Sequence, residues 1–257
     1  MYLHSHFKED KLSRRNRAKV MYQEQEQNVV SINTYYHNKR NRQVTLLPKT
    51  LNQETYINLL TDPSKLIVFA TGPAGTGKTM LAMMAGILAL KNGQVTKLVL
   101  TRPAVGVDDE HHGFLPGDLN QKMEPWTRPL FDVLAEYYDK YTITKMVDEN
   151  IIEISPLAFM RGRTFKNSWI IADEMQNATP NQMKMLLTRI GEGSKMVITG
   201  DTRQTDRTEP ENGLLDFQML VDGYRRAQYV DGVQFEGRDI QRHPAVVEIL
   251  KIYGEIG

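Results

Sequence analysis

The sequence predicts an α/β protein in which a mainly parallel β-sheet carries helices on both faces. Short continuous apolar runs, such as 66–71 and 168–173, have the composition of strands that are buried on both faces. Between such runs, apolar residues recur at helical spacing, as Leu81, Ala85 and Leu88 do. Strands that alternate with helices along a chain are typical of a parallel sheet covered by helices on both sides.

The regular alternation begins near residue 48. The helix expected at 180–190 has a clear start, because Thr179 is a good N-cap and Pro180 suits the first helical position. In chain order we expect a helix at 52–60, strands at 66–71, 97–101, 151–155, 168–173 and 195–199, further helices at 126–141, 180–190, 216–224 and 244–253, and a strand or hairpin near 229–235.

Composition narrows the class of protein. The chain has 257 residues, of which 40% are apolar and 25% charged, as in a soluble globular protein. It has no cysteine, which excludes disulfides, thiol catalysis and thiolate metal sites. The first residues lack the apolar core of a signal peptide, and the apolar stretch at 80–90 is too short to cross a bilayer. We therefore expect a cytoplasmic protein without a membrane partner.

Charge is distributed unevenly along the chain. Residues 1–42 hold nine Lys or Arg and four Asp or Glu, a net charge of +5, whereas the remainder carries −4. We predict a basic, polar N-terminal extension at 1–45 and a folded domain at 46–257. The basic extension suggests weak nucleic-acid contact, although its polarity favours a solvated, partly disordered segment.

A glycine-rich loop follows the strand expected at 66–71. It reads Gly72-Pro-Ala-Gly-Thr-Gly-Lys-Thr79 and fits the P-loop pattern G-x-x-x-x-G-K-T. Its glycines let the backbone turn tightly and direct N–H groups toward phosphates, at a helix N-terminus that favours an anion. Lys78 is expected at the β- and γ-phosphates and Thr79 on Mg²⁺. The loop residues expected to bind a nucleoside triphosphate are Gly72, Pro73, Ala74, Gly75, Thr76, Gly77, Lys78 and Thr79.

An acidic pair ends the apolar run at 168–173. Asp173 stands where the carboxyl ends of parallel strands form a ligand-binding crevice, and an aspartate there can hold Mg²⁺. The adjacent carboxylate, Glu174, can orient or deprotonate an attacking water. This pair favours hydrolysis over phosphoryl transfer to a small acceptor, the alternative being an exposed pair that caps the next helix.

Further polar side chains lie near expected element ends. Gln204 follows the strand at 195–199, which should lie beside the P-loop strand, so Gln204 could reach the γ-phosphate or its water; an exposed turn is the alternative. The Gln53 amide could both donate to and accept from an adenine edge. Arginines that could stabilise a phosphate or grip a nucleic-acid backbone are Arg102, Arg161, Arg163 and Arg242.

Taken together, the motifs resemble the PhoH family of phosphate-starvation-inducible P-loop ATPases, which is similar to the core of superfamily-one helicases. The resemblance covers about residues 46–254. Besides the P-loop, it rests on the segments 101–103, 113–117, 160–164, 170–177, 200–204 and 239–244.

The resemblance implies a RecA-like P-loop NTPase fold that uses ATP and Mg²⁺. It implies that Glu174 is the base and that Gln204 senses the γ-phosphate. It further implies that Gln53 reads adenine and that Arg102 contacts a nucleic-acid backbone. RNA is the polynucleotide that family members are thought to bind or remodel.

The chain has room for one such domain, whereas a two-domain helicase draws arginines from its second domain. An arginine from a neighbouring subunit can raise turnover by a factor on the order of 10³–10⁵. Head-to-tail contacts of this kind close into rings, so we predict a homohexamer with Arg161, Arg163 or Arg242 acting in trans. We predict ATP hydrolysis coupled to RNA or single-stranded DNA; alternatives are a nucleotide-dependent scaffold and a small-molecule kinase.

Overall fold

The computed structural model describes residues 42–103, 119–203, 212–224 and 226–254, with only the backbone of 119–127. The described residues from Gln43 onward belong to one compact unit. Residues 1–41 lie outside the described residues, so the predicted N-terminal extension and its boundary stay a prediction. Gln204 and the segment 113–117 also lie outside them.

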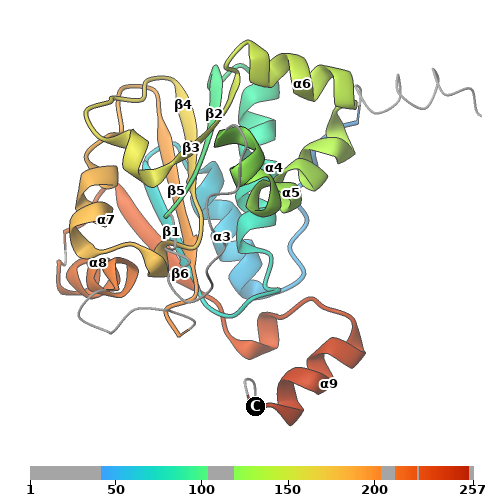
Figure 1. The fold of residues 1–257 in the computed structure, drawn as a ribbon. Helices are drawn as coiled ribbons and strands as arrows, with labels where there is room; N and C mark the ends of the chain where they lie inside the picture. Colours follow the sequence, from blue (N-terminus) through green and yellow to red (C-terminus); the bar gives the residue numbers. More distant parts are fainter. Residues whose placement is uncertain (1–41, 104–118, 204–211, 225, 255–257) are drawn as a thin grey trace, which may run out of the picture. The chain divides into compact units, whose positions relative to one another are not determined.

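Six strands in the described part of the chain form a single parallel sheet in the order β3-β2-β4-β5-β1-β6 (Figure 1). The predicted α/β fold is confirmed. The strand that begins at Lys195 pairs with the P-loop strand, as predicted, and the last strand is a parallel edge strand beside β1 rather than a hairpin. The strands are β1 (Ile67–Thr71), β2 (Lys97–Arg102), β3 (Ile152–Pro156), β4 (Ser168–Ala172), β5 (Lys195–Gly200) and β6 (Val230–Gln234).

Helices connect the strands, and several of their bounds correct the sequence prediction. The helix expected from 126 begins at Leu119, and the helix expected to reach 190 ends at Leu187. The helix expected at 126–141 is interrupted, because Asp139 accepts a hydrogen bond from the Thr142 N–H (2.8 Å) and starts a second helix. The helix expected from 216 begins three residues earlier, because Asn212 caps it. The helices are α3 (Leu51–Thr61), α4 (Lys78–Lys91), α5 (Leu119–Tyr137), α6 (Lys140–Asp148), α7 (Pro180–Leu187), α8 (Gly213–Gly223) and α9 (Pro244–Ile252), with short 3-10 turns η1 (Leu157–Met160), η2 (Met175–Asn177) and η4 (Gly237–Asp239).

The sheet has a hydrophobic core on each face. Because successive strand side chains point to opposite faces, Val68 and Ala70 pack with α3, α4, α5 and α6, whereas Phe69 packs with α7 and α8 (Figure 1). Burial on both faces explains why the strands read as continuous apolar runs. In the described ranges, no helix is long and apolar enough to cross a membrane.

The carboxyl ends of β1, β4 and β5 meet at one edge of the sheet. In the strand register, Thr71 lies beside Gly200, and Ala172 lies beside Ile198. The Gly72 N–H donates to the Gly200 carbonyl (3.2 Å). The P-loop, the acidic pair and the segment after β5 therefore start from neighbouring points on this edge.

Candidate functional site

The P-loop holds a backbone conformation that glycine permits. Gly72, Gly75 and Gly77 have φ angles of +128°, +86° and +88°, where a side chain would be strained. Gly77 is the N-cap of α4, and no described side chain caps this helix, whereas α3, α7 and α8 each have a side-chain cap. The N–H groups of the first turn of α4 are therefore free of a side-chain acceptor and suited to an anion.

Lys78 lies buried at the floor of the loop. Its Nζ donates to the carbonyls of Gly72 (2.6 Å) and Pro73 (2.8 Å) and to Thr76 Oγ1 (3.4 Å). Burial lowers the pKa of the Lys78 ammonium, while the carboxylates of Asp201, Asp173 and Glu174 act in the opposite direction. Three oxygens thus hold this cation against the loop, and its contact with phosphate stays a prediction.

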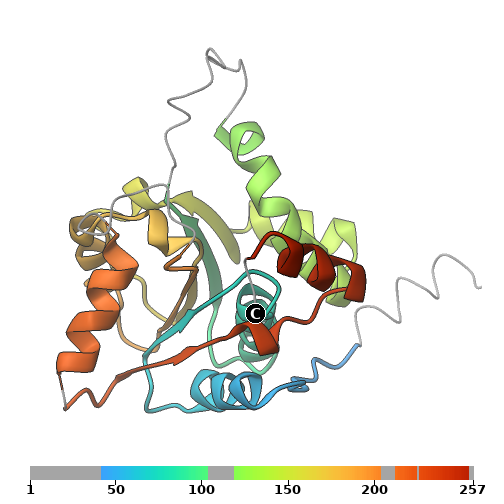
Figure 2. The same cartoon turned by 90° about the horizontal axis from the view of Figure 1, so that it is seen from below.

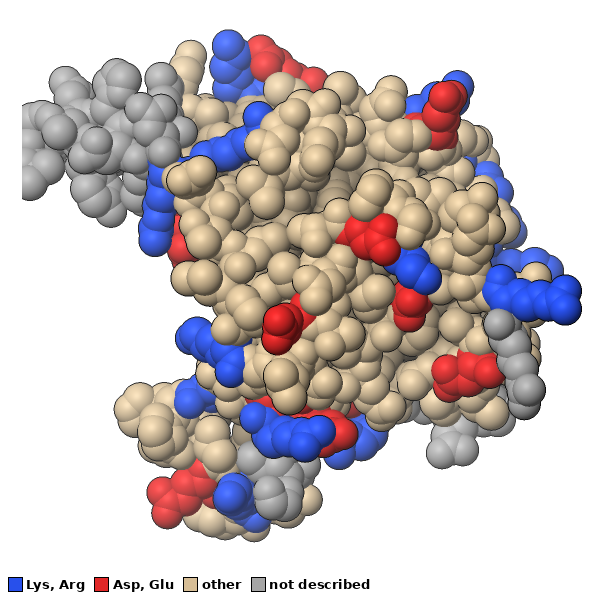
Figure 3. Space-filling model, turned by 180° about the vertical axis from the view of Figure 1, so that it is seen from behind, with Lys and Arg blue, Asp and Glu red and all other residues tan. Residues whose placement is uncertain are grey.

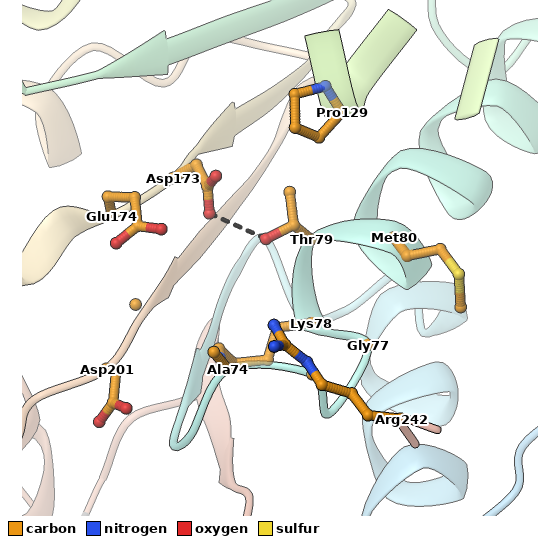
Figure 4. A pocket seen from close by; sticks show the side chains of 12 residues that line it. Ala74, Gly77, Lys78, Thr79, Met80, Pro129, Asp173, Glu174, Asp201 and Arg242 are labelled. Carbon is orange, nitrogen blue, oxygen red and sulfur yellow. Dashed lines mark hydrogen bonds between the residues drawn. The ribbon is translucent and has the colours of Figure 1, made fainter. Parts of the chain in front are cut away.

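Asp173 joins three elements through one oxygen. Its Oδ1 accepts hydrogen bonds from the Thr79 hydroxyl at the start of α4 (2.9 Å, dashed in Figure 4) and from the Thr199 hydroxyl on β5. Hydroxyl and carboxylate oxygens are the hard ligands that Mg²⁺ prefers. Thr79 and Asp173 therefore fit the magnesium site that the sequence predicts, although they are 94 positions apart.

Glu174 occupies a strained position beside this pair. Its φ of 55° and ψ of 38° are left-handed, which is uncommon for a residue with a side chain. The Gln176 Nε2 donates to Glu174 Oε2 (2.6 Å), and the Gln176 Oε1 accepts from the Asp201 N–H (3.2 Å). The amide of Gln176 thus bridges the ends of β4 and β5 and fixes the direction of the Glu174 carboxylate.

These groups line one pocket of about 370 Å³. In Figure 4 the carboxylates of Asp173, Glu174 and Asp201 lie along one side, and Lys78 and Arg242 lie on the other. The pocket therefore combines cations, oxygen ligands and a candidate base within a small volume. Its lining residues are Ala74, Gly75, Gly77, Lys78, Thr79, Met80, Pro129, Asp173, Glu174, Gly200, Asp201 and Arg242.

Arg242 reaches this pocket from the C-terminal segment. The preceding Gln241 N–H donates to the Gly75 carbonyl (2.9 Å), and a Cβ on Gly75 would lie 2.4 Å from the Arg242 Nε. The guanidinium therefore covers the P-loop of its own chain. Its positive charge also adds to the lowering of the Lys78 pKa.

The other predicted arginines lie elsewhere. The Arg163 guanidinium pairs with both carboxylate oxygens of Glu153 and stacks on Phe165, 4.5 Å from the ring centroid. Glu153 is on β3, which three strands separate from the P-loop strand. Arg161 is exposed after η1, and Arg102 is half-buried at the end of β2. None of the three lines the pocket described here.

Gln53 is hydrogen-bonded to the backbone of the P-loop. The side chain is buried, its Nε2 donates to the Thr76 carbonyl (2.9 Å), and its Oε1 accepts from the Lys49 N–H (2.8 Å). Its oxygen is thus engaged with backbone, and one amide hydrogen is left for a ligand. Contact of Gln53 with adenine stays a prediction.

Sequence reasoning gave no role to three residues that complete the site, namely Gln176, Thr199 and Asp201. All three lie within four positions of the end of β4 or β5, where the predicted residues also lie. Their place at strand ends was a usable signal, but their contacts with Asp173, Glu174 and Lys78 depend on which strands are neighbours.

Comparison with known proteins is consistent with this geometry. The family model described as PhoH-like protein matches residues 45–254. The chain is 44% identical to the PhoH-like protein of Mycobacterium tuberculosis strain H37Rv over 209 residues, which is 81% of this chain and 58% of the relative. The PhoH-like protein of Bacillus subtilis strain 168 is 44% identical over 80% of this chain and 63% of its own length.

A third relative is Protein PhoH of Escherichia coli K12, which is 42% identical over 74% of this chain and 53% of its own length. The chain thus spans less than two thirds of the length of these relatives. The family match nevertheless covers most of the chain, including the P-loop, the acidic pair and Arg242. The chain therefore belongs to the PhoH family, whose members are P-loop ATPase-like proteins.

Proposed function

We propose that this protein hydrolyses ATP with the help of Mg²⁺. The observation that carries the proposal is the single pocket in which Lys78, the Thr79–Asp173 oxygen pair and Glu174 lie together. A binding site for phosphate alone would need no carboxylate beside the magnesium ligands. Glu174, held by Gln176, favours water as the attacking group.

Each residue has a defined task in this proposal. The P-loop N–H groups and Lys78 bind the phosphates, and Thr79 and Asp173 would hold the magnesium ion, which offsets phosphate charge. Glu174 orients the attacking water and accepts its proton. Arg242 lies on the same side as Lys78 and stabilises negative charge that develops on the terminal phosphate. Gln204 is proposed to sense the γ-phosphate, and Gln53 to contact adenine.

We further propose that the protein forms a homohexameric ring in which a neighbour completes the site. Arg242 already serves the pocket of its own chain, which leaves Arg161 and Arg163 as the candidates to act in trans. Arg161 is exposed, whereas Arg163 would have to leave Glu153. Arg161 therefore suits a contact with a neighbouring pocket better.

RNA or single-stranded DNA is the proposed polymer partner. On the face seen in Figure 3, basic side chains are scattered among acidic ones rather than gathered in a stripe. We therefore place the contact at the carboxyl edge of the sheet, where Arg102 ends β2 and Arg161 follows η1. A nucleotide-dependent scaffold that moves no strand is the second candidate, because a ring with a γ-phosphate sensor can also act as a switch.

The test is release of free phosphate from ATP and Mg²⁺, with and without RNA or single-stranded DNA, beside native mass measurement. Lys78→Ala should abolish release, and Glu174→Gln should retain nucleotide binding while turnover stops. The exposed Lys184→Ala on α7 should behave as wild type.

Each outcome discriminates between the candidates. Normal turnover by Glu174→Gln would refute its role as base, and a monomer at full rate would refute the ring. Stimulation by a polynucleotide favours the enzyme acting on nucleic acid, and its absence favours the scaffold. Phosphate release without any acceptor excludes the kinase.

A further inference from the structure

The segment after β6 is anchored by a buried carboxylate. Asp239 is 2% exposed, and its Oδ2 accepts from the Asn52 Nδ2 (2.7 Å) and from the Glu236 N–H (2.8 Å). The Thr50 side chain also bonds to it. Burial raises the pKa of Asp239, but these hydrogen bonds outweigh burial and hold it below its usual value. The anchor therefore joins the start of α3 to η4.

The same segment touches the P-loop directly after this anchor. Two residues beyond Asp239, the Gln241 N–H bonds to Gly75, and Arg242 then lies over the loop. Gln53 of α3 also contacts the loop, because it donates to the Thr76 carbonyl. Asp239 thus ties together two elements that each bond to the loop, and Figure 2 shows the segment after β6 passing the start of α3.

The chain beyond Arg242 offers little to hold this arginine in place. None of the residues of α9 is buried, and Ile249 and Ile252 are exposed. Figure 1 shows α9 projecting away from the sheet. Within the described residues, the position of Arg242 therefore depends on the residues that precede it, namely the Asp239 anchor, the buried Ile240 and the Gln241–Gly75 bond.

We propose that Asp239 is a positioning residue that fixes Arg242 over the P-loop, so that the guanidinium meets the terminal phosphate of a bound nucleoside triphosphate. The proposal rests on the proposed function, because it assigns the pocket to a triphosphate. Arg242 lies beside Lys78, the residue that a P-loop places on the β- and γ-phosphates. The anchor should therefore matter for a triphosphate and little for a diphosphate.

The test is a double-mutant cycle read by equilibrium binding. Wild type, Asp239→Ala, Arg242→Ala and the double variant are titrated with a fluorescent non-hydrolysable ATP analogue and with the matching ADP analogue, each with Mg²⁺. Each single change should weaken binding of the triphosphate by about 5- to 30-fold and of the diphosphate by less than about twofold. The double variant should equal Arg242→Ala, since Asp239 acts only through that arginine.

A merely structural role for Asp239 would give a different pattern. Equal losses for both nucleotides, or losses that multiply in the double variant, would overturn the proposal. Asp239→Asn keeps a carbonyl oxygen that can accept the hydrogen bonds and should restore most of the affinity. Asp222→Ala, an exposed carboxylate on α8, is the matched control and should bind as wild type.

Thermal stability distinguishes a loss of folding from a loss of binding. Thermal unfolding is measured for every variant. If Asp239→Ala does not fold, Asn52→Ala is used instead, because it removes one hydrogen bond of the anchor. It should give a smaller loss of affinity that is still selective for the triphosphate. If the protein binds ATP without hydrolysing it, the proposed activity is refuted. The binding data would still test the role of Asp239, because they do not depend on turnover. A wild-type protein that binds neither nucleotide would overturn both.

Discussion

Replacing Gln176 by leucine tests how the candidate base is held. The change keeps a side chain of similar volume in a buried position and removes the amide. The change removes the 2.6 Å bond to the Glu174 carboxylate and the 3.2 Å bond from the Asp201 N–H. Glu174 would then be free to turn away from the pocket.

The magnitude follows from these two bonds. A hydrogen bond to a charged group contributes about 1.5–3 kcal/mol, so its loss should lower the turnover number by about 10- to 100-fold. Lys78 and Thr79 have no hydrogen bond to Gln176, so the affinity for ATP should change by less than about threefold. The Asp201 N–H loses its partner, which should cost about 1–3 kcal/mol and lower Tm by about 3–10 °C.

The assay is steady-state phosphate release at saturating ATP and Mg²⁺, with affinity measured separately by nucleotide titration. Gln94→Leu is the matched control, because Gln94 is an exposed glutamine close to the amino end of β2, and it should retain wild-type turnover. If Gln176→Leu lowers Tm as expected but keeps its turnover number within about threefold of wild type, the bridge does not orient the base.

Two further predictions concern the scaffold. Gly72→Ala should destabilise the fold by about 2–4 kcal/mol, because φ is +128° and the new Cβ would lie 2.3 Å from the Phe235 carbonyl oxygen. Gly223→Ala, where a Cβ would have no atom within 4 Å, should be nearly neutral. Chemical denaturation measures the stability of both variants, and equal stabilities would refute the steric reason. Burial lowers the pKa of Lys195 from 10.5 to about 8, so the unfolded chain retains this proton at higher pH than the folded chain does. The stability of wild type relative to Lys195→Met should therefore rise as pH increases from about 8 to 10.5 and be flat below pH 8. Paired unfolding titrations measure this difference, and a decrease in relative stability between these pH values would contradict the burial effect.

Local sequence pattern was enough to predict several parts of this protein. Apolar runs bounded by polar residues became the buried strands, and the P-loop pattern predicted the junction of β1 and α4, where Lys78 and Thr79 begin the helix. Asp173 and Glu174 were predicted from their position at the end of an apolar run, because ligands bind at the carboxyl edge of a parallel sheet. The break between α5 and α6 was missed, since Asp139 is a local cap inside an amphipathic stretch.

How these parts meet became apparent only in the folded chain. Strand order is not encoded in the pattern of any single strand, and it is the order β4-β5-β1 that brings Asp173 to Thr79 and Gln176 to Asp201. Asn52 and Asp239 are 187 positions apart, yet their contact places Arg242 in the pocket of its own chain. Hydrogen bonds between residues so far apart in sequence depend on how side chains of separate elements are oriented. Those orientations are fixed only when both hydrophobic cores have packed.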